Sequence, residues 1–197
     1  MKADIYDFDR TVIPFDSGSR FAIYCILRHP LLFLLLPYYF ADALLLLFRI
    51  ISLNSFKKHI FIFVRFINLE KNVKGFWDRY EKYVYPWARK ESRERPAIVI
   101  SASPDFLLEE IQKRLGFEYL ICTRHDRKTG TLLYKNCRGE EKVRRFNELF
   151  TDEKPEIECV YSDSIKNDRP IFSLGKHCFH VHSDGSKEEF VFDEMYP

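Results

Sequence analysis

The sequence lacks the paired cysteines that mark a disulfide scaffold or a zinc site. Its five cysteines are odd in number and form no C-x-x-C pair, which favours reduced, intracellular thiols. A large charge of one sign is also missing. The net charge is only +2, so the bulk charge gives no indication of a nucleic-acid partner. The first residues are acidic and strand-like, not a basic region followed by an apolar core, so no secretory signal is expected. These absences favour a cytoplasmic globular protein.

The 197 residues are enough for one α/β core with an inserted subdomain. Strand-like and helix-like patterns alternate in residues 1–14 and 96–197, which predicts a parallel sheet covered by helices on both faces. Residues 15–95 are instead rich in leucine, phenylalanine and basic residues, and predict a helical insertion. Strands are expected within residues 5–8, 96–100, 119–122, 157–161, 177–182 and 189–192, with part of a hairpin at residues 131–134.

Proline, glycine and capping residues predict where the helices begin and end. Asp16 or Ser17 can cap a helix that starts near Arg20. Pro104 is expected in the first turn of a helix that Gly116 ends. Breaks in the helical insertion are expected near Pro30, Pro37, Leu53–Asn54 and Pro86.

The stretch from Leu31 to Phe48 is almost entirely apolar and long enough to be a candidate membrane span. A single complete crossing conflicts with the order of the chain, because candidate catalytic residues both precede and follow this stretch. A second crossing within residues 56–69 would carry several charges. Two alternatives therefore stay open. The helical insertion exposes an apolar surface to a membrane or a lipidic substrate, or its leucines pack inside the insertion's own core.

Asp7 and Asp9 follow the first strand at the point where it should end. Open α/β sheets bind ligands at the carboxyl ends of their strands. One acid of such a pair can attack a phosphorus atom as a nucleophile, and the other can move a proton to or from the reacting oxygen. Because two neighbouring carboxylates repel each other and a phosphate, we expect a divalent cation with them.

Two later strands also end in polar residues. Ser101 follows one of them, and its hydroxyl could bind a phosphoryl oxygen or simply cap the next helix. Asp163 follows another and could complete a magnesium site with Asp7. Lys142 could neutralise charge in the transition state or be a solvated lysine. Asp168 could orient Lys142 or a metal-bound water, or be a turn residue.

These residues together resemble the four motifs of the haloacid dehalogenase-like phosphohydrolases. The motifs are Asp7-Phe8-Asp9-Arg10-Thr11-Val12, the strand that ends at Ser101, the run around Lys142, and Asp163 with Asp168. The resemblance implies a Rossmann-like three-layer core of residues 1–14 and 96–197, with an inserted helical cap of residues 15–95 like that of phosphoserine phosphatases.

The resemblance also implies a role for each site residue. Asp7 would be the nucleophile that forms an aspartyl-phosphate, Asp9 the general acid/base, and Ser101 and Lys142 the other catalytic groups. The family implies a Mg²⁺ ion held by Asp7, by the main-chain carbonyl of Asp9 and by Asp163, with Asp168 beside it. The residues expected to bind substrate are Thr11, Asp16, Ser101 and Ala102. Two departures from the family pattern are Arg10, where many relatives have a small residue, and Ser162, which replaces a common glycine.

The resemblance predicts a phosphomonoesterase whose substrate is a small phosphorylated metabolite or a phospholipid headgroup. Asp16 occupies the position where phosphoserine phosphatases carry an acid for the substrate amine, although it could serve only as a helix cap. The apolar insertion looks more like the phosphatidylglycerophosphatase branch, which would add peripheral membrane contact. The alternative is a phosphate-binding or membrane-docking module without turnover.

A separate hypothesis concerns the histidines near the end of the chain. His177, His180 and His182 surround Cys178, and Cys178, His180 and His182 would share one face of a strand. The pattern indicates either a metal-binding cluster or an ordinary polar sheet edge.

Overall fold

The computed structural model describes residues 1–51 and 59–195. It contains a single six-stranded sheet with the strand order β3-β2-β1-β4-β5-β6. The first five strands are parallel, and β6 is antiparallel to β5. The strands are β1 (Lys2–Tyr6), β2 (Ala97–Pro104), β3 (Tyr119–Thr123), β4 (Glu156–Ser162), β5 (Gly175–Val181) and β6 (Lys187–Phe190). The predicted parallel α/β sheet is therefore confirmed.

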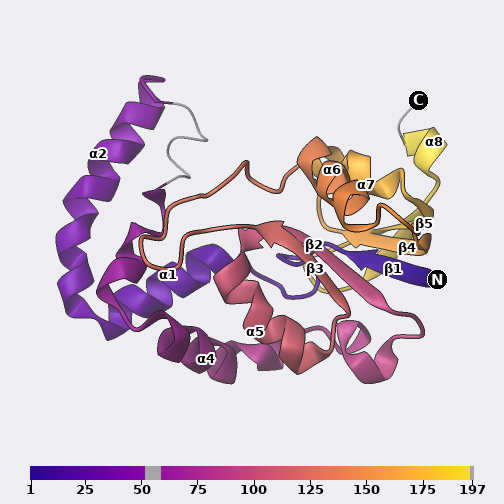
Figure 1. Cartoon of the computed structure of the whole chain (residues 1–197), viewed down its shortest axis with the longest axis horizontal. Helices are drawn as coiled ribbons and strands as arrows, with labels where there is room; N and C mark the ends of the chain where they lie inside the picture. The colour runs from indigo at the N-terminus through magenta and orange to yellow at the C-terminus, as the bar shows by residue number, and fades with distance from the viewer. Residues whose placement is uncertain (52–58, 196–197) are drawn as a thin grey trace.

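Helices cover both faces of this sheet (Figure 1). The α-helices are α1 (Ser17–Arg28), α2 (Leu36–Leu47), α4 (Leu69–Tyr80), α5 (Asp105–Leu115), α6 (Glu140–Leu149), α7 (Ile165–Phe172) and α8 (Phe192–Met195). Short 3-10 turns are η1 (Pro30–Leu35), η2 (Ile62–Phe66), η3 (Glu81–Tyr83), η4 (Pro86–Ala88) and η5 (Lys90–Ser92).

Each face of the sheet has its own apolar cluster. On one face, Phe146 of α6 and Phe172 of α7 pack with Ile5 of β1. On the other face, the core continues from the sheet into the predicted insertion, where Phe21 of α1 and Trp77 of α4 are fully buried. The insertion therefore shares a core with the sheet. The division into a core of residues 1–14 and 96–197 and a cap of residues 15–95 stays a prediction.

Local sequence signals account for most helix ends. Asp16 caps α1, which begins at Ser17, three residues before the expected start at Arg20. Gly116 ends α5 in the left-handed region (φ 61°), where glycine carries no steric penalty. Pro104 lies just before α5 rather than in its first turn. The predicted break near Leu53–Asn54 lies outside the described residues.

Two further local predictions agree with the structure. The break expected near Pro37 falls between η1, which ends at Leu35, and α2, which begins at Leu36, and Pro37 lies in the first turn of α2, where a missing N–H costs no hydrogen bond. Residues 131–134 run antiparallel to the residues before Gly130, as the predicted hairpin requires: a bridge joins Leu132 to His125, and the Leu133 amide donates to the Arg124 carbonyl at 3.0 Å. The pairing is limited to this isolated bridge, and Leu133 and Tyr134 are exposed.

The segment Pro30–Leu47, made of η1 and α2 and called the apolar arm below, stands away from the sheet at one end of the molecule (Figure 1). Within the described residues it is the one helical stretch long and apolar enough to cross a membrane, with 18 residues and a mean hydropathy of 1.9. Only 6% of it is buried, and α2 has no buried residue. Most of these leucines are therefore exposed, whereas Leu32 is buried in the core and is the part of the run for which the packing alternative holds.

Candidate active site

Two parallel strands, β1 and β4, bring the predicted acids to one edge of the sheet. β1 lies between β2 and β4, and the Asp7 amide continues the ladder by donating to the Tyr161 carbonyl of β4 at 2.9 Å. Asp7 thus leaves the centre of the sheet at its carboxyl edge, beside the end of β4 where Asp163 follows. This is the convergence expected of parallel strands.

The Lys142 ammonium joins two of these acids. It comes from the first turn of α6, is 2% exposed, and lies 2.7 Å from Asp7 Oδ1 and 2.7 Å from Asp168 Oδ1. Asp7 and Asp168 are also buried. The interpretation of Lys142 as a solvated lysine is wrong, and Asp168 is not a free turn residue.

Asp9 is held by a different set of groups. Its Oδ1 accepts a hydrogen bond from the Ser17 amide at 2.8 Å, and its Oδ2 accepts one from the Ser103 hydroxyl. The Ser17 and Ser103 hydroxyls are 3.1 Å apart. These bonds fix the Asp9 carboxylate at the start of α1. This role of Ser103 was not predicted from the sequence.

Ser101 and Thr11 both use their hydroxyls within the protein. Ser101 is 1% exposed, and its Oγ accepts from the Ser103 amide at 3.2 Å. Thr11 Oγ1 accepts from the Asp163 amide at 2.9 Å and donates to Asp7 Oδ2 at 3.4 Å. Thr11 therefore ties the loop after β1 to the loop after β4. Their predicted contacts with substrate stay predictions.

A family model described as haloacid dehalogenase-like hydrolase matches residues 5–173. The chain belongs to this family. The predicted resemblance is confirmed, and so is the prediction of an enzyme of the family.

Solved structures support the fold of this hydrolase. A protein of unknown function from Bordetella pertussis Tohama I is 16% identical, with a TM-score of 0.74, over 91% of this chain and 89% of that one. A phosphoserine phosphohydrolase-like protein from Francisella tularensis is 14% identical, with a TM-score of 0.58, over 92% and 88% of the two chains. A phosphoserine phosphatase, solved as a phospho-aspartyl intermediate analogue, is 15% identical, with a TM-score of 0.55, over 91% and 86%. No curated protein matched.

The two departures from the family pattern have structural reasons in this hydrolase. Arg10 has a φ of 60°, the left-handed region that a glycine adopts without strain, which explains why small residues are common there. Burial raises the pKa of Asp163, and the positive charge of Arg10 opposes this rise. Ser162 donates to Asp168 Oδ2 at 2.6 Å, so its hydroxyl orients one of the two acids around Lys142.

Burial governs the electrostatics of the site. It raises the pKa of Asp7 to about 8, against the opposing effect of Lys142. It also raises the pKa of Asp9 to about 6, with a further contribution from Asp16. Burial alone would lower the pKa of Lys142, but the Asp7 and Asp168 carboxylates outweigh it and keep this pKa above its ordinary value. Lys142 therefore stays charged at neutral pH.

The donor set fits the Mg²⁺ ion that the family implies. Asp7, Asp9, Asp163 and Asp168 offer oxygen atoms, which Mg²⁺ prefers. Burial and neighbouring carboxylates raise the pKa of Asp7 and of Asp163. A further positive charge beside these two acids would therefore favour their ionised forms.

A cavity of about 200 Å³ opens between this site and the helical insertion. Its lining includes Asp9, Ala102 and Ser103 together with Asp16 and Phe61. The predicted substrate residues Ala102 and Asp16 thus lie on the wall of one cavity with the predicted acid/base. Ser103 lines this cavity, and Ser101 does not.

Asp16 serves as the N-cap of α1, since its Oδ1 accepts from the Ser19 amide at 2.7 Å. We expect Asp16→Ala to lower the free energy of unfolding by about 1 kcal/mol, and Asp16→Asn to change it by only a few tenths, because Asn caps nearly as well as Asp. Urea denaturation of the two variants would measure this. Equal destabilisation by both would contradict the capping role.

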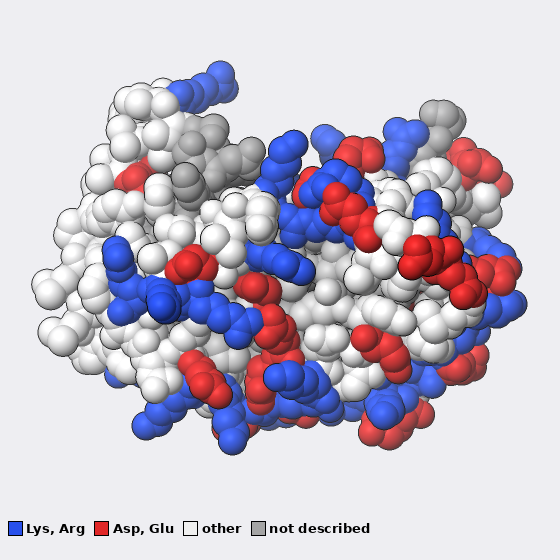
Figure 2. All heavy atoms as spheres, in the orientation of Figure 1, with Lys and Arg blue, Asp and Glu red and all other residues white. Residues whose placement is uncertain are grey.

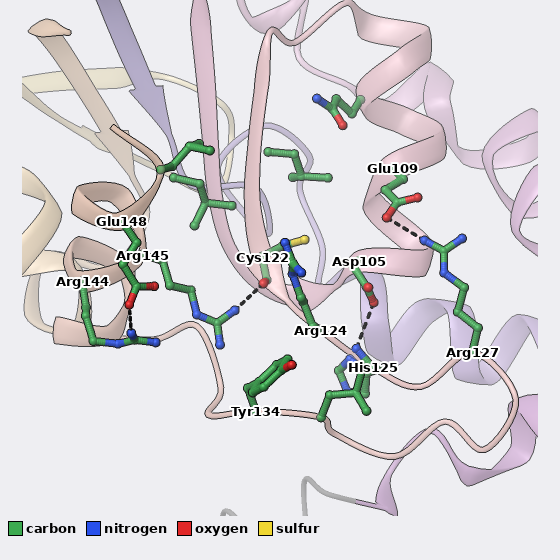
Figure 3. Close-up of a pocket in the computed structure, with 15 residues that line it drawn as sticks. Asp105, Glu109, Cys122, Arg124, His125, Arg127, Tyr134, Arg144, Arg145 and Glu148 are labelled. Carbon is green, nitrogen blue, oxygen red and sulfur yellow. Dashed lines mark hydrogen bonds and ion pairs between the residues drawn. The ribbon is translucent and has the colours of Figure 1, made fainter. Parts of the chain in front are cut away.

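A larger basin of about 1060 Å³ lies beside the edge strand β3, between α5 and α6 (Figure 3). Asp7, Asp9 and Lys142 do not line it. Three of its arginines are engaged: Arg127 pairs with Glu109 at 2.6 Å, Arg145 donates to the Cys122 carbonyl at 2.6 Å, and Arg144 pairs with Glu148. Asp9 lines only the smaller cavity, whereas His125 lines both.

Two residues of the predicted metal-binding cluster, Cys178 and His177, do not lie with the others. Cys178 is buried, and its thiol lies 3.4 Å from the Phe172 carbonyl in the core. His177 pairs instead with Glu189, its Nδ1 lying 2.7 Å from the Glu189 Oε1. His180 and His182 remain close to each other, with ring centroids 4.6 Å apart.

Proposed function

We propose that this hydrolase is a Mg²⁺-dependent phosphomonoesterase that works through an aspartyl-phosphate on Asp7. The contact of one buried ammonium, that of Lys142, with both Asp7 and Asp168 carries the proposal. A phosphoryl group needs positive charge around its oxygens and a nucleophile held in line with its leaving group. Lys142 provides such a charge beside the carboxylate proposed to attack.

In the first step, Asp7 attacks the phosphorus and the bond to the ester oxygen breaks. Asp9 gives its proton to that oxygen as the alcohol leaves. In the second step, Asp9 takes a proton from water, whose oxygen attacks the phosphorus and releases phosphate and Asp7. A pKa of about 6 lets Asp9 hold the proton in one step and accept it in the other. Asp7, Asp163 and the Asp9 carbonyl, with Asp168 nearby, would hold Mg²⁺. The ion would offset the negative charge of the carboxylates and of the phosphoryl group.

The substrate is either a small phosphorylated metabolite or a phospholipid headgroup. The cavity of about 200 Å³ suits a small group attached to the phosphate. The apolar arm favours the alternative of a phospholipid substrate. Assays with phosphatidylglycerophosphate, phosphoserine and p-nitrophenyl phosphate, each with Mg²⁺ and with EDTA, separate the alternatives. Turnover that EDTA abolishes is expected with at least one of them. Phosphate binding without turnover of any phosphomonoester would favour the non-catalytic module.

We also infer that the apolar arm contacts a membrane surface. Leu31, Leu34 and Leu47 are each more than 70% exposed, and Figure 2 shows that this end of the molecule carries few charged residues. Apolar side chains extend around α2, which has no buried residue on any side. Because the exposed side chains of this helix are mostly apolar, a lipid phase suits it better than a single groove in a protein.

The chain on both sides of the apolar arm packs against the core. Phe21 of α1 precedes the arm and Phe63 of η2 follows it, and both are buried in the same cluster. The two ends of the arm therefore lie on the side of the catalytic acids. This favours insertion of the arm into one membrane surface rather than a complete crossing.

Charge placed on the arm should release the protein from vesicles. We expect the double variant Phe40→Asp/Leu47→Asp to co-sediment at least about tenfold less with vesicles of anionic phospholipid, because both side chains are more than 60% exposed and a charge is costly in the apolar part of a bilayer. Val191→Asp, at an exposed apolar residue on another part of the molecule, is the matched control and should still co-sediment. Equal co-sedimentation of the unmodified protein and both variants would exclude the apolar arm as the membrane contact.

A further inference from the structure

The edge hairpin of β5 and β6 brings two histidines and a glutamate together. His180 of β5 lies opposite Glu188 of β6 in the strand register, and His182 follows two residues after His180. Each of the three offers one ligand atom, and these atoms lie within 4.8 Å of one another. Residues two apart on a strand share a face, so the spacing alone directs both imidazoles to the same side.

The contact of His180 with the main chain leaves one of its nitrogens available to a metal. Its Nε2 lies 3.0 Å from the carbonyl oxygen of Asp163. A carbonyl only accepts, so Nε2 carries the hydrogen and Nδ1 of the neutral ring keeps a lone pair. Histidine ligands of metals commonly donate their other N–H to a backbone carbonyl, which fixes the ring and its tautomer.

The other two groups already face each other. His182 Nε2 lies 3.0 Å from Glu188 Oε2, so one small movement of either side chain would let both bind the same ion. Glu188 is well exposed and His182 is partly exposed, so an ion can enter from solvent. A histidine–glutamate pair alone does not make such a site: His177 and Glu189 form one without a second imidazole.

We propose that His180, His182 and Glu188 form a binding site for a transition-metal dication such as Zn²⁺, with water completing its coordination. Two imidazoles and one carboxylate are a typical zinc ligand set, whereas Mg²⁺ prefers oxygen ligands alone. The site is therefore chemically distinct from the proposed Mg²⁺ site, and it does not depend on the proposed phosphatase activity. Through His180, it borders the main chain of Asp163 at the edge of the catalytic acids.

Titration of the full-length protein with Co²⁺ in excess Mg²⁺ tests the site, because Mg²⁺ occupies oxygen-only sites and Co²⁺ reports its nitrogen ligands by visible absorption. One equivalent of Co²⁺ should give an absorption band that Zn²⁺ abolishes by displacement. His182→Gln and Glu188→Gln should each raise the dissociation constant at least about tenfold, since each removes a ligand. His177→Gln removes a histidine from the same strand and should change nothing.

Three results would overturn the proposal: no saturable band, a band that both ligand variants retain at full affinity, or equal loss of affinity in His177→Gln. The ligand variants alter partly exposed side chains and can be checked for folding by circular dichroism. Phosphatase activity measured with Mg²⁺ alone is a separate readout, so loss of Co²⁺ binding and loss of turnover are distinguishable.

Discussion

Asp7→Asn is expected to lower kcat for every phosphomonoester substrate by at least about 10³-fold, because an amide cannot attack phosphorus. Asn has nearly the shape of Asp, so the Thr11 hydroxyl and Lys142 keep a polar partner of the same size in the buried site. Steady-state kinetics of the variant, with Mg²⁺ in excess, would measure the loss.

The matched control for this experiment is Asp152→Asn, which makes the same chemical change at an exposed position away from the strand ends. It should retain full activity. Far-ultraviolet circular dichroism and urea denaturation should show that both variants fold. If folded Asp7→Asn protein turned over substrate at the rate of the control, Asp7 would not be the nucleophile.

Lys142→Met should cost about 3–5 kcal/mol of stability at pH 8, because it leaves the buried Asp7 and Asp168 carboxylates without their cation. The loss should be smaller at pH 5. Burial already raises the pKa of Asp7 to about 8, and removal of Lys142 raises it further. The native variant then binds more protons than the unfolded chain, so its stability falls as pH rises from about 4 towards 8.

Urea denaturation at the two pH values, in EDTA, measures this dependence. Lys166→Met, an exposed lysine of the neighbouring helix α7, is the control and should change stability by less than about 0.5 kcal/mol at either pH. Addition of Asp168→Asn to Lys142→Met should recover part of the loss, since one uncompensated charge is removed. A loss for Lys142→Met that is independent of pH would mean that lost packing, and not unpaired charge, is its cause.

The main elements of the site could be predicted from the sequence because they depend on strand ends. Asp7, Ser101 and Asp163 each follow an apolar run, and parallel strands deliver such residues to one edge. Lys142 could be assigned only by resemblance. It is separated from Asp7 by 135 positions, and nothing in its basic neighbourhood distinguishes it from a surface lysine.

Ser103 illustrates what could not be predicted. Its hydroxyl holds Asp9 across 94 positions of the chain, and a serine in a Ser-x-Ser-Pro stretch gives no local sign of such a partner. The apolar arm is a second example. Its composition permitted both burial and exposure, and only the packing of its neighbours decided between them. Local sequence patterns specify helices and strands, whereas tertiary contacts decide which of their faces stay exposed to solvent.

Chemical trapping of the intermediate tests the central claim most directly. Protein mixed with ³²P-labelled substrate and Mg²⁺ is quenched in acid, reduced with borohydride and digested, because borohydride converts an aspartyl-phosphate to homoserine at the modified position. The account predicts acid-stable label before reduction and homoserine at position 7, both absent from Asp7→Asn protein. Turnover without protein-bound label, or homoserine at Asp9 instead of Asp7, would contradict it.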